Sequence, residues 1–312
     1  MLVSIIIPCY NSEKSIRRVV EMTYGTLQEV LPDYDIEFVL VDDCSRDRTY
    51  EQIKSLADDY PFVHGATLMR NFGQHNALMC GLNIAKGDLI MGMDDDMQTH
   101  PSQVPLIVNK MQEGYDVVYG VYHEYTNGLI KNITSHLNRL SAQKMLGRPK
   151  DIRTSNFWMI RKCIRDEVIK YTNYNPYVDA LFSRMTTRIG NVEVEHHERM
   201  YGSSNYTLMK LLKLWLSYFN YTTLPLRFVS TMGMGMAALG FLATILMVLY
   251  KLIAPSVTVG WTSIICVMLI FFGLVLLSLG IIGEYLGNLV LSANGSPQFV
   301  VREFTDLERE KK

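Results

Sequence analysis

Features that would assign this chain to several other protein classes are missing from its sequence. It has five cysteines in 312 residues, and none forms a CxxC pair or a Cys/His metal-ligand spacing, which disfavours a disulfide framework and a structural zinc site. The formal net charge of −1 removes the electrostatic argument for nucleic-acid binding. The apolar run before Pro8 is too short for a signal peptide and lacks a basic segment, so we expect a buried strand there.

Residues 1–205 alternate short apolar runs with segments of helical periodicity. This alternation predicts an α/β domain with a doubly wound, Rossmann-like sheet, in which the loops after the strands converge on one crevice. The expected helices include Glu13–Leu31 and Arg48–Asp59. The expected strands are Val3–Pro8, Glu37–Val41, Val63–Met69, Asp88–Met93 and Val117–Tyr119.

Two long uncharged apolar stretches follow this domain, at Phe228–Tyr250 and Trp261–Gly283. Each is close to the ~20 residues that a helix needs to cross a bilayer, so we predict two transmembrane helices. Basic residues precede the first stretch, whereas the connecting loop has only Lys251, and the positive-inside rule therefore puts the α/β domain in the cytoplasm. We expect a multi-pass protein of the cytoplasmic membrane, with residues 284–312 as a cytoplasmic tail that frays from Arg302.

Residues 206–227 place apolar side chains at helical spacing with Lys210 and Lys213 between them. An amphipathic core helix would explain this pattern by itself, but directly before an apolar stretch we expect helices that lie in the membrane interface. Small residues within Phe228–Tyr250 permit close helix packing, which makes a homo-oligomer a reasonable expectation.

Three adjacent carboxylates, Asp94, Asp95 and Asp96, come directly after the expected strand Asp88–Met93. Such a cluster repels itself unless a cation neutralises it, and Mg²⁺ or Mn²⁺ bound by Asp94 and Asp96 would be shared with substrate phosphates. A solvated acidic turn would also explain three adjacent aspartates. Their place at the end of a buried strand favours the metal site.

Two other strand ends carry side chains that suit a nucleotide. The first offers Tyr10 for stacking on a base, and the second offers Asp42 and Asp43 as acceptors for a base N–H or a ribose hydroxyl. Helix capping by Asn11 or Ser12 explains the first loop equally well. The argument therefore depends on the joint occurrence of the three loops at one edge of the sheet.

These loops lie in the segments VSIIIPCYNSE, VLVDDCSRDRT, LMRNFGQHNALMCGL and GDLIMGMDDDMQTHP, which resemble inverting family-2 glycosyltransferases of the GT-A fold. The later segments GSSNYTLMKLLKLW, LPLR and GIIGEYLG resemble the bacterial polyprenyl-phosphate branch, so the resemblance covers nearly the whole chain. It implies transfer of a sugar from a nucleotide-sugar, with a UDP-sugar favoured, to polyprenyl (undecaprenyl) phosphate for cell-envelope glycan or lipid modification.

The loops and the resemblance together imply roles for individual residues. The resemblance matches Asp94 and Asp96 to the metal and diphosphate motif, Arg139 to an acceptor-side arginine and Arg199 to a basic residue near the phosphates. The expected nucleotide-binding set is Pro8, Tyr10, Glu13, Asp42, Asp43, Arg70, Gln74 and Asp95.

Two residues depart from the family's pattern. Asn205 stands where relatives commonly have lysine, so Lys210 or Lys213 would have to supply that phosphate contact. Asn156 stands where many relatives have an aspartate that could act as general base. A phosphate monoester has a second pKa near ~6 and is largely dianionic at neutral pH, so the acceptor needs no base and we expect an active enzyme. The expected catalytic set is Asp94, Asp96, Asn156 and, as second-choice carboxylate, Asp179.

Two alternative functions stay open. A processive polysaccharide synthase of the same superfamily would carry a QxxRW motif and more membrane helices, and the sequence has neither. A catalytically silent, nucleotide-binding membrane scaffold is favoured only by Asn156 and Asn205. The intact Asp94 and Asp96 count against a scaffold, which has no need of clustered carboxylates.

Overall fold

The computed structural model describes residues 1–122, 152–195 and 260–305, and between the last two ranges residues 226, 229–233, 235, 242, 245 and 249. The chain divides into two compact units, one formed by Met1–Thr207 and Gly295–Lys312 and the other by Leu208–Asn294. More than half of the apolar stretch Phe228–Tyr250, expected to be the first transmembrane helix, falls outside the described residues.

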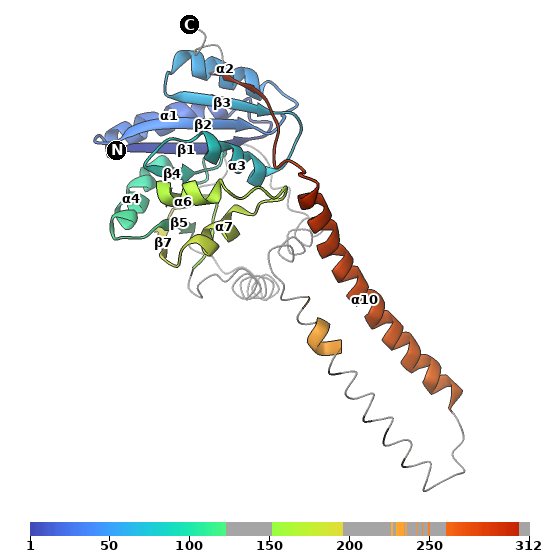
Figure 1. Ribbon diagram of the computed structural model, residues 1–312. Helices are drawn as coiled ribbons and strands as arrows, with labels where there is room; N and C mark the ends of the chain where they lie inside the picture. The colour runs from blue at the N-terminus through green and yellow to red at the C-terminus, as the bar shows by residue number, and fades with distance from the viewer. Residues whose placement is uncertain are drawn as a thin grey trace. The chain divides into compact units, whose positions relative to one another are not determined.

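The described part of the first unit contains an eight-stranded sheet in the order β7-β5-β6-β4-β1-β2-β3-β8 (Figure 1). Strands β1 to β4 are parallel to their neighbours among these four, β5 pairs in parallel with β7, and β6 runs antiparallel between β4 and β5. The strands are β1 (Leu2–Cys9), β2 (Asp35–Asp42), β3 (Val63–Leu68), β4 (Leu89–Gly92), β5 (Val117–Tyr122), β6 (Trp158–Arg161), β7 (Ile189–Val194) and β8 (Val301–Phe304).

Helices cover both faces of the sheet, and the pleat of the strands divides the core between them. Val3, Ile5 and Ile7 pack on one face with α1, α2 and α4, whereas Ile6 packs on the other with α3, α6 and α7. The helices are α1 (Ile16–Val30), α2 (Thr49–Asp59), α3 (Gln74–Ile84), α4 (Val104–Gln112), α6 (Lys162–Val168) and α7 (Val178–Met185), with the short 3₁₀ turn η1 (Pro101–Gln103). The α/β class is therefore confirmed.

The sheet departs from the expected parallel arrangement at two strands. β6 and β8 are antiparallel to their neighbours, so the sheet is mixed. The tail is expected to fray from Arg302, but its first residues form β8, because backbone pairing with β3 and local polar contacts hold them there; residues 306–312 lie outside the described part of the chain. Glu303 pairs with Lys54 at 2.6 Å, and the backbone N–H of Gly65 donates to Thr305 Oγ1 at 2.8 Å. Charged side chains are common on edge strands, so the high density of charge in this segment does not indicate that it frays.

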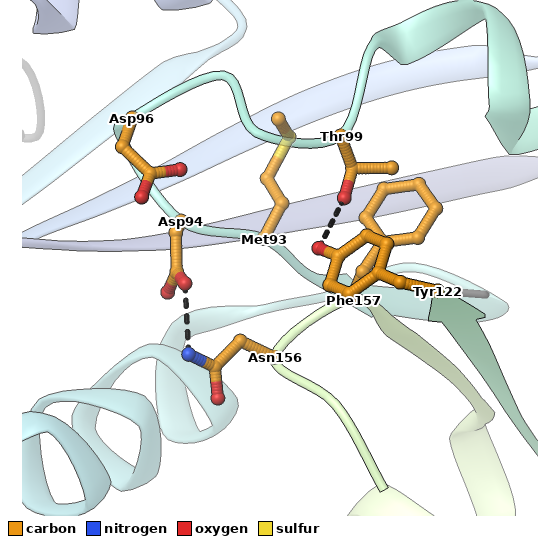
Figure 2. Close-up of a pocket in the computed structure, with 7 residues that line it drawn as sticks. All are labelled: Met93, Asp94, Asp96, Thr99, Tyr122, Asn156 and Phe157. Atoms are coloured by element: carbon orange, nitrogen blue, oxygen red, sulfur yellow. Dashed lines mark hydrogen bonds between the residues drawn. The ribbon is translucent and has the colours of Figure 1, made fainter. Parts of the chain in front are cut away.

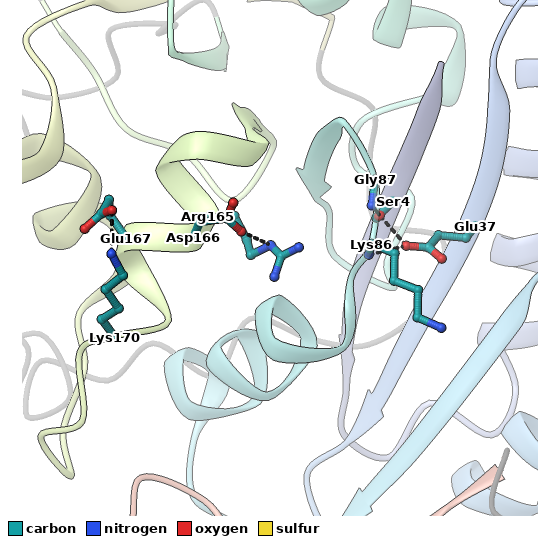
Figure 3. A network of polar contacts seen from close by, with 8 residues as sticks. All are labelled: Ser4, Glu37, Lys86, Gly87, Arg165, Asp166, Glu167 and Lys170. Carbon is teal, nitrogen blue, oxygen red and sulfur yellow. Dashed lines mark hydrogen bonds and ion pairs between the residues drawn. The ribbon is translucent and has the colours of Figure 1, made fainter.

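A buried carboxylate joins three segments near the start of β1 and β2, at the edge of the sheet away from the strand C-termini (Figure 3). Glu37, only 6% exposed, accepts hydrogen bonds from the hydroxyl of Ser4, its register partner, and from the backbone N–H of Lys86 at 2.7 Å. The N–H of Gly87 donates to Ser4 Oγ at 2.6 Å. This network fixes β1 and β2 against the turn that leads into β4.

The described part of the second unit contains α10 (Trp261–Ala293), an apolar helix of 33 residues and therefore about 50 Å long. Its stretch Phe271–Ala293 has a mean hydropathy of 1.9 and is long and apolar enough to cross a membrane. Among the described residues no other helix meets these criteria. The helix extends ten residues beyond Gly283, the expected end of the second span, because Glu284 does not interrupt it.

Candidate active site

The acidic triplet Asp94–Asp96 lies in a turn directly after β4, at the C-terminal edge of the sheet. Met93 and Met97, 3% and 4% exposed, flank the triplet and are both buried in the hydrophobic core. Met97 has a positive φ of 56°, a backbone conformation that costs a non-glycine residue roughly 1 kcal/mol. The two buried methionines therefore hold the carboxylates in a sharp turn at the surface.

Asp94 is held by one amide on each carboxylate oxygen. Gln74 Nε2, from the first residue of α3, donates to Asp94 Oδ1 at 3.0 Å. Asn156 Nδ2, two residues before β6, donates to Asp94 Oδ2 at 2.8 Å (Figure 2). These two neutral donors orient the Asp94 carboxylate without neutralising its charge.

A pocket opens beside Asp94 and Asp96, and its wall combines polar and apolar side chains (Figure 2). The hydroxyls of Thr99 and Tyr122 lie 2.6 Å apart in this wall. Burial raises the pKa of Tyr122, the hydrogen bond with Thr99 lowers it, and the charges of Asp94 and Asp96 raise it again. The net shift is upward, so Tyr122 remains a neutral hydrogen-bonding group at physiological pH. The lining residues are Met93, Asp94, Asp96, Thr99, Tyr122, Asn156 and Phe157.

The donor set of this pocket suits a hard divalent cation that shares its ligands with a substrate. Asp94 and Asp96 both line it, and Asp96 Oδ1 accepts a hydrogen bond from its own turn, from Gln98 N at 3.1 Å. Within the described part of the chain, no three acidic, histidine or cysteine side chains converge as a metal-binding group. Mg²⁺ is commonly held by one or two carboxylates plus phosphate oxygens and water, which two aspartates beside an open pocket can accommodate.

The middle carboxylate of the triplet has a different partner. Asp95 Oδ2 accepts a hydrogen bond from the hydroxyl of Ser12, in the loop after β1. That loop presents Tyr10, whose side chain is 45% exposed, and its backbone turns through Asn11 at a positive φ of 58°. The loop expected to bind a nucleoside is thus joined to the acidic turn.

Reciprocal hydrogen bonds join the loops after β1 and β2. Asn11 N donates to Ser45 Oγ at 2.9 Å, and Arg46 N donates to Asn11 Oδ1 at 3.0 Å. Glu13 takes part with both its backbone and its carboxylate, donating to Asp47 at 3.2 Å and accepting from Arg48 N at 3.3 Å. Glu13 precedes α1, which begins at Ile16, three residues later than the sequence pattern predicts.

Asp42 and Asp43 are almost inaccessible, at 2% and 4% exposure. Asp42 accepts hydrogen bonds from Thr67 Oγ1 at 2.6 Å and from Ser45 N at 3.1 Å. Asp43 accepts from the backbone N–H groups of Phe72 and Gly73, at 2.7 and 2.8 Å. Burial raises the pKa of Asp43, while these two N–H donors oppose that rise. In this structure both carboxylates hold neighbouring loops in place.

The remaining predicted residues lie at varied distances from the pocket. Pro8 is half-buried in β1, beyond the last register pair with β4, where a missing N–H is tolerated. The exposed Arg70 stacks on the ring of Phe72 at 4.6 Å. Asp179, in the first turn of α7, accepts a hydrogen bond from the buried Tyr119 at 3.0 Å and does not line the pocket. Arg139, Arg199, Lys210 and Lys213 fall outside the described residues.

Sequence reasoning missed five residues of this site. Met93, Thr99, Tyr122 and Phe157 line the pocket, and Ser12 connects to Asp95. The apolar pattern predicts a strand that ends at Tyr119, whereas β5 extends to Tyr122 at the same edge of the sheet as the triplet. Nothing in the local pattern indicates Phe157 or the partner of Ser12, because both depend on tertiary contacts.

The fold and the placement of the acidic turn define a glycosyltransferase of the GT-A type. The chain is similar in structure to glucosyl-3-phosphoglycerate synthase from Mycobacterium tuberculosis, crystallised in complex with Mn²⁺ and UDP-glucose. The TM-score is 0.51 at 18% sequence identity, over 70% of this chain and 77% of the other. The same synthase in complex with Mg²⁺ and UDP also gives a TM-score of 0.51.

Residues 4–169 match the family described as Glycosyl transferase family 2, and the chain belongs to that family. It is similar over its whole length to two bacterial proteins named undecaprenyl-phosphate 4-deoxy-4-formamido-L-arabinose transferase. The one from Yersinia pestis (strain Pestoides F) is 31% identical, over 98% of this chain and 94% of that protein. The one from Proteus mirabilis (strain HI4320) is 29% identical, over 99% of this chain and 96% of that protein.

Proposed function

We propose that the protein transfers a sugar, with inversion at the anomeric carbon, from a nucleotide-sugar to a polyprenyl phosphate at the cytoplasmic face of the membrane. The observation that carries this proposal is the pocket beside Asp94 and Asp96, where the residue opposite Asp94 is the amide Asn156 at 2.8 Å. Two carboxylates that bind a divalent cation suit the diphosphate end of a donor. An amide cannot act as a general base at physiological pH. This suits a phosphate acceptor that is already ionised and has no proton to lose.

The order of the strands supports a direction for the donor across the site. In the sheet, β1, β2 and β3 lie on one side of β4, and β6 and β5 lie on the other. We assign the nucleoside to the first side, against Tyr10 and Glu13, with Pro8, Asp42, Asp43, Arg70 and Gln74 supporting these loops. The diphosphate then lies at Asp94 and Asp96, and the sugar lies toward Asn156 and Tyr122. A UDP-sugar is the favoured donor, since the structurally similar synthase binds UDP-glucose.

Asp94 and Asp96 are the residues that we assign to a divalent metal. A bound Mg²⁺ or Mn²⁺ would neutralise charge on the departing diphosphate. Gln74 and Asn156 keep Asp94 oriented, and Asn156 also lines the pocket. Preorganised groups of this kind act without reorganising during the reaction.

The acceptor's ionisation makes a general base unnecessary. A phosphate monoester is largely dianionic at neutral pH, because its second pKa is about 6. One of its oxygens forms a bond to the anomeric carbon while the bond from that carbon to the diphosphate oxygen breaks. The nucleoside diphosphate leaves with the electron pair, and no proton moves. The protein's tasks are to align the two reactants and to stabilise the leaving group. We assign Arg139, Arg199, Lys210 and Lys213 to the phosphates, and Asp179 to a supporting role.

The lipid acceptor is supported by the names of the two relatives, which transfer to undecaprenyl phosphate, and by the apolar helix α10. We propose that Phe228–Tyr250 forms a second transmembrane helix, that residues 206–227 lie in the membrane interface, and that the α/β unit is cytoplasmic. Small residues in the first span favour a homo-oligomer.

The test is to incubate the purified protein and undecaprenyl phosphate with a panel of nucleotide-sugars and either Mg²⁺ or Mn²⁺. Mass spectrometry of the lipid fraction is expected to show a sugar–phospholipid together with released nucleoside diphosphate. Free sugar as the only product would indicate transfer to water and would contradict the lipid acceptor. Absence of any product across a panel of UDP-, GDP- and other nucleotide-sugars would contradict the transfer itself.

A further inference from the structure

The three carboxylates of the acidic turn face three different surroundings, although they are adjacent in sequence. Asp94 is held by Gln74 and Asn156, and Asp96 lines the same pocket. Asp95 does not line that pocket, and its Oδ2 accepts the hydrogen of Ser12 Oγ, 83 residues away in sequence. The turn therefore presents Asp94 and Asp96 to the pocket and Asp95 to the loop after β1.

Ser12 is placed to pass this contact on to the loop after β1. It is 3% exposed, and its Oγ also accepts a hydrogen bond from the backbone N–H of Tyr10 at 3.1 Å. Its own N–H donates to Thr49 Oγ1 at 2.7 Å. The hydroxyl therefore uses its one hydrogen on Asp95 and an oxygen lone pair on Tyr10, which joins the acidic turn to the backbone of the exposed aromatic residue.

The other strand-end loops complete a closed ring of hydrogen bonds. Gln74, the first residue of α3, joins Asp94 to the loop before that helix. The backbone N–H groups of that loop donate hydrogen bonds to Asp43, which follows β2. The loop after β2 returns to the loop after β1 through contacts such as Ser12 with Thr49. The ring has one direct link between the acidic turn and the Tyr10 loop among the contacts described, and that link is Asp95 with Ser12.

We propose that Asp95 is a positioning residue, which holds the Tyr10 loop through Ser12 and contacts neither the donor nor the metal. The proposal deepens the proposed function and rests on it for the identity of the donor. Under this assignment the two ends of a nucleotide-sugar are recognised by loops that are kept at a set separation. Asp95, predicted from the sequence to bind the nucleotide, then acts on nucleotide affinity only through Tyr10.

The variants Asp95→Ala, Asp95→Asn and Ser12→Ala test this assignment, because they separate hydrogen bonding from charge. An asparagine oxygen can still accept the Ser12 hydrogen, whereas alanine cannot accept it. Asp96→Asn serves as the comparison that alters the pocket directly. Each variant is made in the full-length protein in detergent, and two measurements are taken on each one.

The first measurement is hydrogen exchange of the backbone amide of Tyr10 without any ligand, so it is independent of the donor's identity. We expect exchange to accelerate about tenfold in Asp95→Ala and in Ser12→Ala, the ratio that one charge-assisted hydrogen bond supports, and to stay within about twofold of wild type in Asp95→Asn and Asp96→Asn. If the Tyr10 amide of Asp95→Ala exchanged at the same rate as in the wild type, the proposal would be overturned.

The second measurement is the affinity for UDP at several Mn²⁺ concentrations. We expect UDP to bind about tenfold more weakly to Asp95→Ala and Ser12→Ala, with the half-saturating Mn²⁺ concentration unchanged, and near wild-type binding to Asp95→Asn. A shifted Mn²⁺ requirement in Asp95→Ala, or equal losses in Asp95→Asn and Asp95→Ala, would show a direct contact and refute the positioning role. If UDP fails to bind wild type, the proposed donor is wrong, and the exchange measurement still decides the role of Asp95.

Discussion

The side-chain amide of Asn156 donates a hydrogen bond to Oδ2 of Asp94 at 2.8 Å, and the two residues are 62 positions apart in the chain. A carboxylate in place of that amide would confront Asp94 with like charge at hydrogen-bonding distance. Two carboxylates so close cannot both ionise freely, so one of the pair acquires a raised pKa. The amide removes this conflict at every pH in which the protein is folded.

Asn156→Asp is therefore expected to make activity depend on pH in a way that the wild type does not. The protonated carboxyl can donate to Asp94 as the amide does, so activity relative to wild type should fall as the pH rises through the raised pKa. Asn156→Ala, which removes the donor without adding charge, should lower the transfer rate about tenfold at all pH values. Transfer rates between pH 5.5 and 8.5 check both. A constant ratio of Asn156→Asp to wild type across this range would contradict the like-charge argument.

Asp96→Asn is expected to abolish most of the transfer activity. The substitution preserves size and removes one of the two carboxylates that line the pocket, and losses of preorganised electrostatic groups typically cost about 10²–10³-fold in rate. Asp58→Asn, on the exposed face of α2, is the matched control and should retain wild-type activity. Lipid-linked product is measured with saturating metal and again with a chelator. Undiminished product from Asp96→Asn would contradict the role assigned to Asp96 in binding the metal.

The stability of the α/β unit is expected to fall in mild acid because of His75. Burial lowers the pKa of His75 from 6.5 to about 4, and its ring packs edge-on against Tyr177 at 4.7 Å. At a pH between these two values, His75 is protonated in the unfolded chain but neutral in the folded protein. Stability is therefore lost as the pH falls from about 6.5 to about 4, by about 3 kcal/mol at most.

His75→Phe supplies the control for that pH dependence. It keeps a ring against Tyr177 and removes Nδ1, a buried atom without a hydrogen-bond partner among the described residues. The variant should match or exceed wild-type stability at pH 7 and lose less between pH 6.5 and 4, as measured by thermal unfolding in detergent. If wild type and His75→Phe lost the same stability between pH 6.5 and 4, His75 would be excluded as the cause of the acid destabilisation.

Glu37→Ala is expected to destabilise the fold without changing the site directly. It leaves the buried hydroxyl of Ser4 and the part-buried N–H of Lys86 without their acceptor, and an unsatisfied buried donor costs about 1–3 kcal/mol. Glu29→Ala, at an exposed position of α1, should change stability by less than about 0.5 kcal/mol. Denaturant unfolding followed by intrinsic fluorescence gives both values. Equal midpoints for the two variants would mean that the network contributes nothing.

The sequence predicted those strands whose apolar side chains show that they are buried. Buried parallel strands are continuous apolar runs, so β1 to β5 were located, and the general rule for strand-end loops brought Asp94 and Asp96 to one edge. The sequence could not predict where each side chain of a loop points, because neighbouring residues can face opposite sides. Asp95 and Asp43 were therefore grouped with residues of the pocket although they face neighbouring loops. β8 was missed because an edge strand held by backbone pairing has no apolar signature.

The position of β8 in the chain also bears on the order in which the protein matures. β8 pairs with β3, and Gly65 and Thr305 are in contact across 240 residues of sequence. A ribosome adds about 5–20 residues per second, so the edge of β3 waits for roughly ten to fifty seconds after its own synthesis. During that interval the whole of α10 must leave the ribosome. The sheet is therefore completed only in molecules that already carry their apolar helix, and a chain truncated before residue 300 would expose an unpaired strand edge.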